Sequence, residues 1–199
     1  FSRSKITSWI KSGDALINNK TFKPKDKVQG NEIIYLVSSH KVNNNWLPEK
    51  LNLEIVYEDE DIIVINKPFG LVTHPGAGNW SGTLANGLLY YDSKLSNLDR
   101  AGIVHRLDKN TSGLMVVSKN TKSQKFLIEQ LQTHSIEREY SAIVYGHMIS
   151  GDTINEPIGR DPKDRVKQAV LINGKEAITH YRAIDRFKSH THVKAILET

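Results

Sequence analysis

The stretch that decides the fold reads AGIVHRLDKNTSGLMVVSK and covers residues 101–119. Its two apolar runs, 102–104 and 114–117, predict buried strands, because each is short, continuous and bounded by turn-forming residues. The segment between them is rich in residues that form turns. We therefore expect a loop with charged side chains between two strands of the core.

Asp108 lies in this predicted loop and is the candidate catalytic carboxylate. Loops held by a rigid scaffold present polar side chains to a substrate while the flanking strands fix their position. Asp108 also has a structural interpretation, since loop aspartates often accept backbone N–H bonds and cap turns. Spacing alone does not separate these two interpretations.

Composition narrows the class of protein. Lysine and arginine number 27 against 22 aspartate and glutamate residues, a net charge of +5 that favours a polyanionic partner. Cysteine is absent, which excludes a disulfide framework, a thiolate zinc site and a thiol nucleophile.

No run approaches the roughly 20 apolar residues of a membrane span. We expect a cytoplasmic protein without a membrane partner. Because the sequence starts at Phe1 without a signal peptide, we also expect it to begin inside a longer chain.

The first 37 residues predict a small basic module of one helix followed by two strands. Ile6, Trp9 and Ile10 follow helical spacing, and apolar runs at 15–17 and 33–37 predict the strands. Three basic side chains on the helix can contact RNA phosphates, or they belong to an ordinary solvated face. These are Arg3, Lys5 and Lys11. The polar segment 38–50, interrupted by a proline, predicts a linker.

Residues 51–199 predict an α+β domain with a largely antiparallel sheet. Strands are expected at 53–57, 61–66, 137–146, 177–184 and 191–198, and helices at 83–90 and from 121 onward. The alternation in 137–146 places Tyr140 with Ala142 and Val144 on one face. Residues 152–172 are expected to form a basic loop region, Lys67 a surface amine and His74 a loop histidine. Because His190 and His192 have no partners at metal-ligand spacing, we expect no metal site.

Several motifs carry a resemblance to known families. HRLDKNTSGL, residues 105–114, resembles the signature of the RluA-type pseudouridine synthases, and Arg138-Glu139-Tyr140-x-Ala142 resembles a second motif of that family. The spacing of Ser2, Arg3, Ile6, Ile10 and Gly13 is similar to that of S4 RNA-binding domains. The resemblance implies that Asp108 is catalytic, that Arg106 holds the target base out of its stem, and that Tyr140 stacks on that base. At two residues' spacing, Arg106 faces the same way as Asp108 on an extended chain.

The resemblance also implies the domain organisation and the activity. We expect an S4-like module at 1–37 that lacks its first helix, a linker at 38–50, and a pseudouridine synthase catalytic domain at 51–199 with a mixed, mainly antiparallel sheet and flanking helices. The expected reaction is isomerisation of specific uridines in large-subunit ribosomal RNA, by a monomer that needs no cofactor and binds an RNA stem-loop or the pre-ribosomal large subunit. The family pattern continues past Thr199 with an arginine that pairs with the aspartate, so we expect the 199 residues alone to turn over poorly.

Two alternatives remain open at the level of sequence. A synthase of the same family can act on other ribosomal sites or on tRNA. A non-catalytic RNA-binding or ribosome-assembly protein can use the S4-like module with Asp108 in a structural role. A hydrolase is poorly supported, because no second carboxylate or catalytic triad stands at a recognisable spacing.

Overall fold

The computed structural model describes residues 3–36, 46–76, 78–164 and 167–199, without the side chains of Ser4 and Lys5. Two compact units make up the chain, one ending at Asn120 and the other beginning at Thr121. Most of the predicted linker, residues 38–45, lies outside the described residues, as does the side chain of Lys5. Over the described ranges, no helix is long and apolar enough to cross a membrane.

The N-terminal residues form a helix followed by a two-stranded sheet. Helix α1 (Arg3–Ser12) is followed by β1 (Ala15–Ile17) and β2 (Ile34–Leu36), which pair in antiparallel register with Leu16 opposite Tyr35. Gly13 has a φ of +79°, a conformation that glycine adopts freely, and it ends the helix. The predicted order of helix, strand and strand is confirmed.

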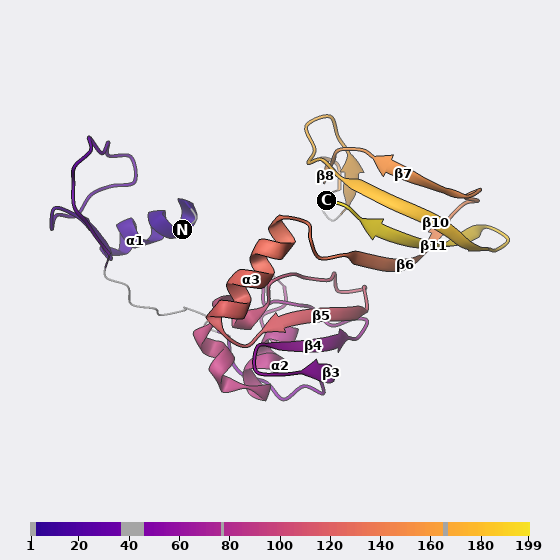
Figure 1. The fold of residues 1–199 in the computed structure, drawn as a ribbon, viewed down its shortest axis with the longest axis horizontal. Coiled ribbons are helices and arrows are strands. Elements are labelled where there is room, and N and C mark those ends of the chain that lie inside the picture. The colour runs from indigo at the N-terminus through magenta and orange to yellow at the C-terminus, as the bar shows by residue number, and fades with distance from the viewer. Residues whose placement is uncertain (1–2, 37–45, 77, 165–166) are drawn as a thin grey trace. The chain divides into compact units, whose positions relative to one another are not determined.

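A three-stranded antiparallel sheet forms the core of the first unit, with its strands side by side in Figure 1. It consists of β3 (Glu54–Glu58), β4 (Ile62–Lys67) and β5 (Gly113–Ser118), with β4 in the centre. Side chains alternate strictly along β4, and one face is fully buried: Ile63, Ile65 and Lys67. The predicted strands 53–57, 61–66 and 114–117 are confirmed.

Helical segments connect β4 to β5. They are α2 (Leu84–Tyr91) and the short 3-10 helices η1 (Ser93–Asn97) and η2 (Asp99–Gly102). Leu84 and Leu88 of α2 are fully buried, as the helical periodicity of that segment predicts, and Leu95 of η1 is also fully buried.

The prediction of a strand at 102–104 is wrong. Gly102 belongs to η2, and only Ile103 makes an isolated bridge, to Val117 of β5. Gly102 has a φ of +80°, and a Cβ added there would lie 2.1 Å from the Ser118 carbonyl oxygen. Arg100 and Ala101 also have positive φ. The left-handed backbone keeps the chain from extending before Ile103.

The second unit contains α3 (Thr121–Gln132) and a four-stranded antiparallel sheet in the order β6-β11-β10-β7, visible in Figure 1. These strands are β6 (Arg138–Tyr145), β7 (Gly151–Asn155), β10 (Ile178–Arg186) and β11 (His190–Leu197). Tyr140, Ala142 and Val144 share the less exposed face of β6, as predicted.

Residues 152–172 differ from the predicted loop region. This segment contains β7 and the short hairpin of β8 (Ile158–Arg160) and β9 (Gln168–Val170). Short strands with few apolar residues depend on pairing with distant segments, as β7 pairs with β10. All strand pairs within the described ranges are antiparallel, and with the helices they establish an α+β fold.

Candidate active site

Asp108 lies on an exposed loop immediately before β5. Its side chain is 87% exposed, and its backbone carbonyl accepts a hydrogen bond from the Thr111 N–H at 3.0 Å, which closes the turn. Within the described part of the chain, the Asp108 carboxylate accepts no backbone N–H bond. The carbonyl rather than the side chain stabilises the turn, so the structural interpretation of Asp108 as a turn cap is not supported. Its carboxylate stays open to a ligand.

The residues on either side of Asp108 are held firmly. The buried Thr73 hydroxyl donates to the Leu107 carbonyl at 2.8 Å, and the Gly70 N–H donates to the Lys109 carbonyl at 2.8 Å. The 70–73 segment is itself fixed, because the carbonyl of Thr73 accepts a hydrogen bond from the first turn of α2. An exposed carboxylate is thereby attached to a backbone held from both sides, which fixes the place from which it can reach a substrate.

Lys67 supports the same loop from inside the core. Its side chain is fully buried, and its Nζ donates to the carbonyls of Pro68 at 3.0 Å, Leu71 at 2.9 Å and Lys109 at 3.4 Å. Burial lowers the pKa of Lys67 below its ordinary value, and the negative charge of Asp108 opposes this by raising it. The expectation that Lys67 is a surface amine is therefore wrong. Its ammonium joins the 68–71 turn to the Asp108 loop.

Arg106 faces Asp108, as their spacing predicts. Its guanidinium lies 4.0 Å from the Asp108 carboxylate, and the side chain is 69% exposed. An ion pair this long and this exposed contributes little to stability, at most about 1 kcal/mol. Arg106 is therefore free to turn toward a ligand. Both charged groups are available at one surface.

His105 and His74 lie close to the Asp108 loop. The Nε2 atom of His105 accepts a hydrogen bond from the Val116 N–H at 3.0 Å, which places the ring proton on Nδ1. His74 is half-buried beside Trp46, with ring centroids 5.8 Å apart. Its Nε2 is a buried atom that has no hydrogen-bond partner among the residues that the structure describes. Burial lowers the pKa of His74 to about 4, and the nearby Arg100 and Arg106 add to this shift.

The lowered pKa of His74 predicts an acid-sensitive contribution to stability. Because its pKa in the folded state lies below the ordinary 6.5, the unfolded chain takes up a proton between pH 6.5 and about 4 while the folded chain does not. Stability therefore falls as the pH drops through this window. His74→Phe keeps an aromatic ring beside Trp46 and removes the titration. In urea unfolding at pH 7, 6 and 5, the free energy of unfolding should fall less steeply for His74→Phe than for wild type. The difference in slope should be up to about 1.4 kcal/mol per pH unit. An equal fall in the free energy of unfolding with decreasing pH in wild type and His74→Phe would contradict the prediction.

The other predicted site residues belong to different parts of the chain. Tyr140 lies on the less exposed face of β6 in the second unit. Arg3 and Lys11 are exposed at the two ends of α1, where they are accessible to a polyanion. In the ranges that the structure describes, no group of three or more metal-ligating side chains gathers.

The comparisons with known proteins define the class. Residues 61–199 match the RNA pseudouridylate synthase family, and the chain belongs to this family. Two solved human structures share the fold. "RNA Pseudouridylate Synthase Domain Containing 1" is 23% identical, with a TM-score of 0.59 over 74% of this chain and 60% of that chain. "RNA Pseudouridylate Synthase Domain Containing 4" is 25% identical, with a TM-score of 0.55 over 73% and 59%. The predicted family is confirmed.

Curated relatives are similar over the whole chain. Proteins named "Ribosomal large subunit pseudouridine synthase D" are 48% identical over 199 residues in Xylella fastidiosa, 49% over 201 in Neisseria meningitidis and 49% over 200 in Escherichia coli K12. Each alignment covers all of this chain, and 60%, 54% and 61% of the respective relative. The chain therefore spans about 60% of the length of these relatives.

Proposed function

We propose that this chain carries the catalytic loop of an enzyme that isomerises specific uridines to pseudouridine in large-subunit ribosomal RNA. The observation that carries the proposal is the exposed Asp108 carboxylate on a backbone held through Leu107 and Lys109. Membership of the family supports the reaction, and the names of the curated relatives support the ribosomal target. The net charge of +5 suits an RNA partner.

The reaction breaks the bond between uracil N1 and ribose C1′, turns the base, and joins C5 to C1′. An ionised Asp108 can begin it in two ways: by removing a proton from C2′, which leads to a glycal, or by attacking C1′ or C6 as a nucleophile. Both routes need a carboxylate that the substrate can reach, and the exposure of Asp108 satisfies that requirement. Neither route calls for a metal or an organic cofactor.

Arg106 and Tyr140 are proposed to handle the target base. A uridine paired or stacked within RNA must leave its stack before a carboxylate reaches its ribose, at a cost of a few kcal/mol. Arg106 would hold the target base out of its stem, and the exposure of its guanidinium, 4.0 Å from Asp108, supports this role. Tyr140 supplies an aromatic ring on which uracil can stack.

The N-terminal module is proposed to add affinity for RNA. We propose that residues 1–37 form the S4-like module, 38–50 the linker and 51–199 the catalytic domain. Arg3, Lys5 and Lys11 would contact phosphates, which positions the RNA without reading its sequence. We further propose that the whole protein acts in the cytoplasm as a monomer.

A tritium-release assay tests the proposed reaction. RNA labelled with tritium at uridine C5 loses the label to water when the base is rejoined through C5. The full-length protein should release tritium from large-subunit ribosomal RNA, and mapping should find pseudouridine at few positions. RNA binding without release would favour a non-catalytic ribosome-assembly protein. Release from tRNA alone would indicate a synthase with another target.

Tyr140 gives a test of base stacking. Tyr140→Leu removes the ring and is expected to lower kcat/KM about tenfold or more, because stacking of one base on an aromatic side chain contributes about 1–3 kcal/mol. Tyr140→Phe keeps the ring and should retain most of the activity. The matched control is Tyr145→Leu on the same strand, where the side chain is 85% exposed on the opposite face. Equal losses in the Leu and Phe variants would assign the effect to the hydroxyl instead.

A further inference from the structure

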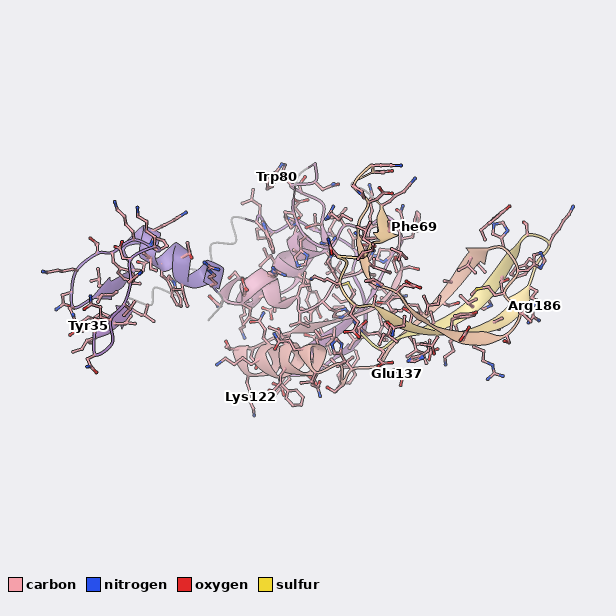
Figure 2. All side chains as sticks on the ribbon, turned by 90° about the horizontal axis from the view of Figure 1, so that it is seen from above. Tyr35, Phe69, Trp80, Lys122, Glu137 and Arg186 are labelled. Atoms are coloured by element: carbon pink, nitrogen blue, oxygen red, sulfur yellow. The ribbon has the colours of Figure 1, made fainter. Side chains whose placement is uncertain are left out.

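Phe69 is an exposed aromatic residue at the tip of the turn that follows β4, and it is labelled in Figure 2. Its side chain is 71% exposed, although large apolar side chains are usually buried. The turn contains Pro68 and Gly70, and Gly70 has a φ of +86°, which glycine adopts without strain. The reaction proposed above gives Phe69 no role.

The turn that carries Phe69 is bonded directly to the Asp108 loop. On one side of Phe69, the Pro68 carbonyl accepts a hydrogen bond from the buried Lys67 Nζ at 3.0 Å. On the other side, the Gly70 N–H donates to the carbonyl of Lys109, the residue that follows Asp108, at 2.8 Å. Phe69 is thus held at a fixed place beside the candidate catalytic loop, which reduces the entropy lost when it binds a ligand.

We propose that Phe69 stacks on an unpaired base of the substrate RNA, at a nucleotide next to the uridine that reaches Asp108. This inference rests on the proposed function and adds a contact to a neighbouring nucleotide. Aromatic side chains bind unpaired bases by stacking, with little dependence on sequence, because every base has a flat π-face. Arg106 and Lys109, both exposed on the adjoining loop, supply positive charge for the phosphates on either side of such a base.

The surroundings of Phe69 favour RNA over a protein segment as the occupant. The exposed residues on the bonded loop are charged or polar: Arg106, Asp108, Lys109 and Asn110. An apolar protein segment packed on Phe69 would also take these groups out of water, at a cost that its own side chains would not offset. An RNA loop presents a stacking surface and phosphates together. Packing of protein on Phe69 is therefore the rival outcome of the test.

The test uses Phe69→Ala, Phe69→Leu and Phe69→Trp in the full-length protein. The probe is a stem-loop RNA with 2-aminopurine, whose fluorescence is quenched by stacking, at one loop position at a time. With wild type and Phe69→Trp, one position beside the target uridine should be quenched on binding. With the Ala and Leu variants that quenching should be lost, and Kd and KM should rise about tenfold. The control is Phe187→Ala, which removes a phenylalanine 51% exposed in the turn between β10 and β11 and should leave Kd and quenching unchanged.

Two results would overturn the proposal. One is unchanged Kd and quenching in Phe69→Ala, which would show that the ring does not contact RNA. The other is a lowered Tm for Phe69→Ala with unchanged Kd, which would assign the ring to protein packing. The assay is independent of the proposed reaction, because binding and quenching can be measured on Asp108→Asn. If wild type releases no tritium, the proposed function fails, while the quenching still decides whether Phe69 stacks on RNA.

Discussion

Replacing Asp108 by asparagine in the full-length protein is expected to lower uridine isomerisation on the order of 10³-fold or more, with RNA binding retained. Asparagine has nearly the same shape as aspartate, but it is neither a base nor a nucleophile at neutral pH. Single-turnover tritium release measures the loss, and filter binding with a stem-loop RNA measures the affinity. The expected change is confined to the rate.

The structure explains why this substitution should leave the loop in place. The backbone around Asp108 is held through the carbonyls of Leu107, Asp108 and Lys109, none of which the substitution removes. Among the described residues, the ion pair of this carboxylate is the exposed one with Arg106 at 4.0 Å. Losing a pair of this kind costs at most about 1 kcal/mol of folding free energy. A large loss of stability in Asp108→Asn would therefore contradict the proposed geometry.

A matched variant separates the role of this carboxylate from a general effect of charge. Glu60 lies exposed in the turn between β3 and β4, and Glu60→Gln makes the same change of carboxylate to amide. This control should keep the wild-type rate. Activity of Asp108→Asn near that of Glu60→Gln would rule out Asp108 as the catalytic group, and the proposed mechanism would fail with it.

Local periodicity was enough to predict most elements of the fold. Strand β4 alternates, α2 buries leucines at helical spacing, and β6 places Tyr140 with its less exposed residues. These elements have a buried face whose spacing is visible in the sequence. Their pairing also follows simple rules, since β3 and β4 are joined by a short turn and pair antiparallel.

The segment 99–104 could not be predicted in the same way. The apolar run 102–104 suggested a strand, but Gly102 belongs to η2, has a positive φ and lies so close to the Ser118 carbonyl of β5 that a Cβ would not fit there. Arg100 and Ala101 adopt positive φ without any local sequence signal for it. A contact between residues 16 positions apart overrides local preference here. The same applies to β8 and β9, whose strands depend on pairing with each other.

The candidate site was predicted unevenly. The HRLDKNTSGL motif identified Asp108 and Arg106, and the structure brings the two side chains within 4.0 Å of each other. Lys67 was missed, because a lysine after an apolar strand suggests an exposed end. One signal was available: Lys67 continues the alternation of Ile63 and Ile65, which places it on the buried face of β4. A charged side chain on the buried face of a strand needs a hydrogen-bonding partner inside the protein.

Lys67→Met is expected to lower kcat about 10²-fold, because it removes the ammonium that joins the 68–71 turn to the Asp108 loop, and a displacement of about 1 Å can cost this much. Methionine fills similar volume but donates no hydrogen bond. The carbonyls of Pro68, Leu71 and Lys109 lose a common donor, so the free energy of unfolding should fall by about 1–3 kcal/mol. Because Lys67 is buried and is not proposed to contact the substrate, KM should change less than kcat.

Alkaline pH provides a readout specific to the buried amine. Burial lowers the pKa of Lys67 below its ordinary 10.5, so in the interval between the two values the unfolded chain holds a proton that the folded chain has released. Unfolding then takes up a proton, and the stability of wild type gains a contribution that rises with pH across this interval. The Met variant lacks that contribution. As the pH is raised toward 10.5, urea unfolding should therefore show a widening gap in the free energy of unfolding between wild type and Lys67→Met.

Lys119→Met is the matched control for this prediction. Lys119 follows the far end of β5 and pairs with Glu58 at 2.7 Å, a contact that raises its pKa. Removing it should destabilise the β3–β4 turn and leave kcat near the wild-type value, because the Asp108 loop precedes the opposite end of the strand. If Lys119→Met lowered kcat as much as Lys67→Met, the loss would reflect stability alone. A loss of kcat confined to Lys67→Met would show that the buried Lys67 ammonium positions Asp108, in addition to the hydrogen bonds from Gly70 and Thr73.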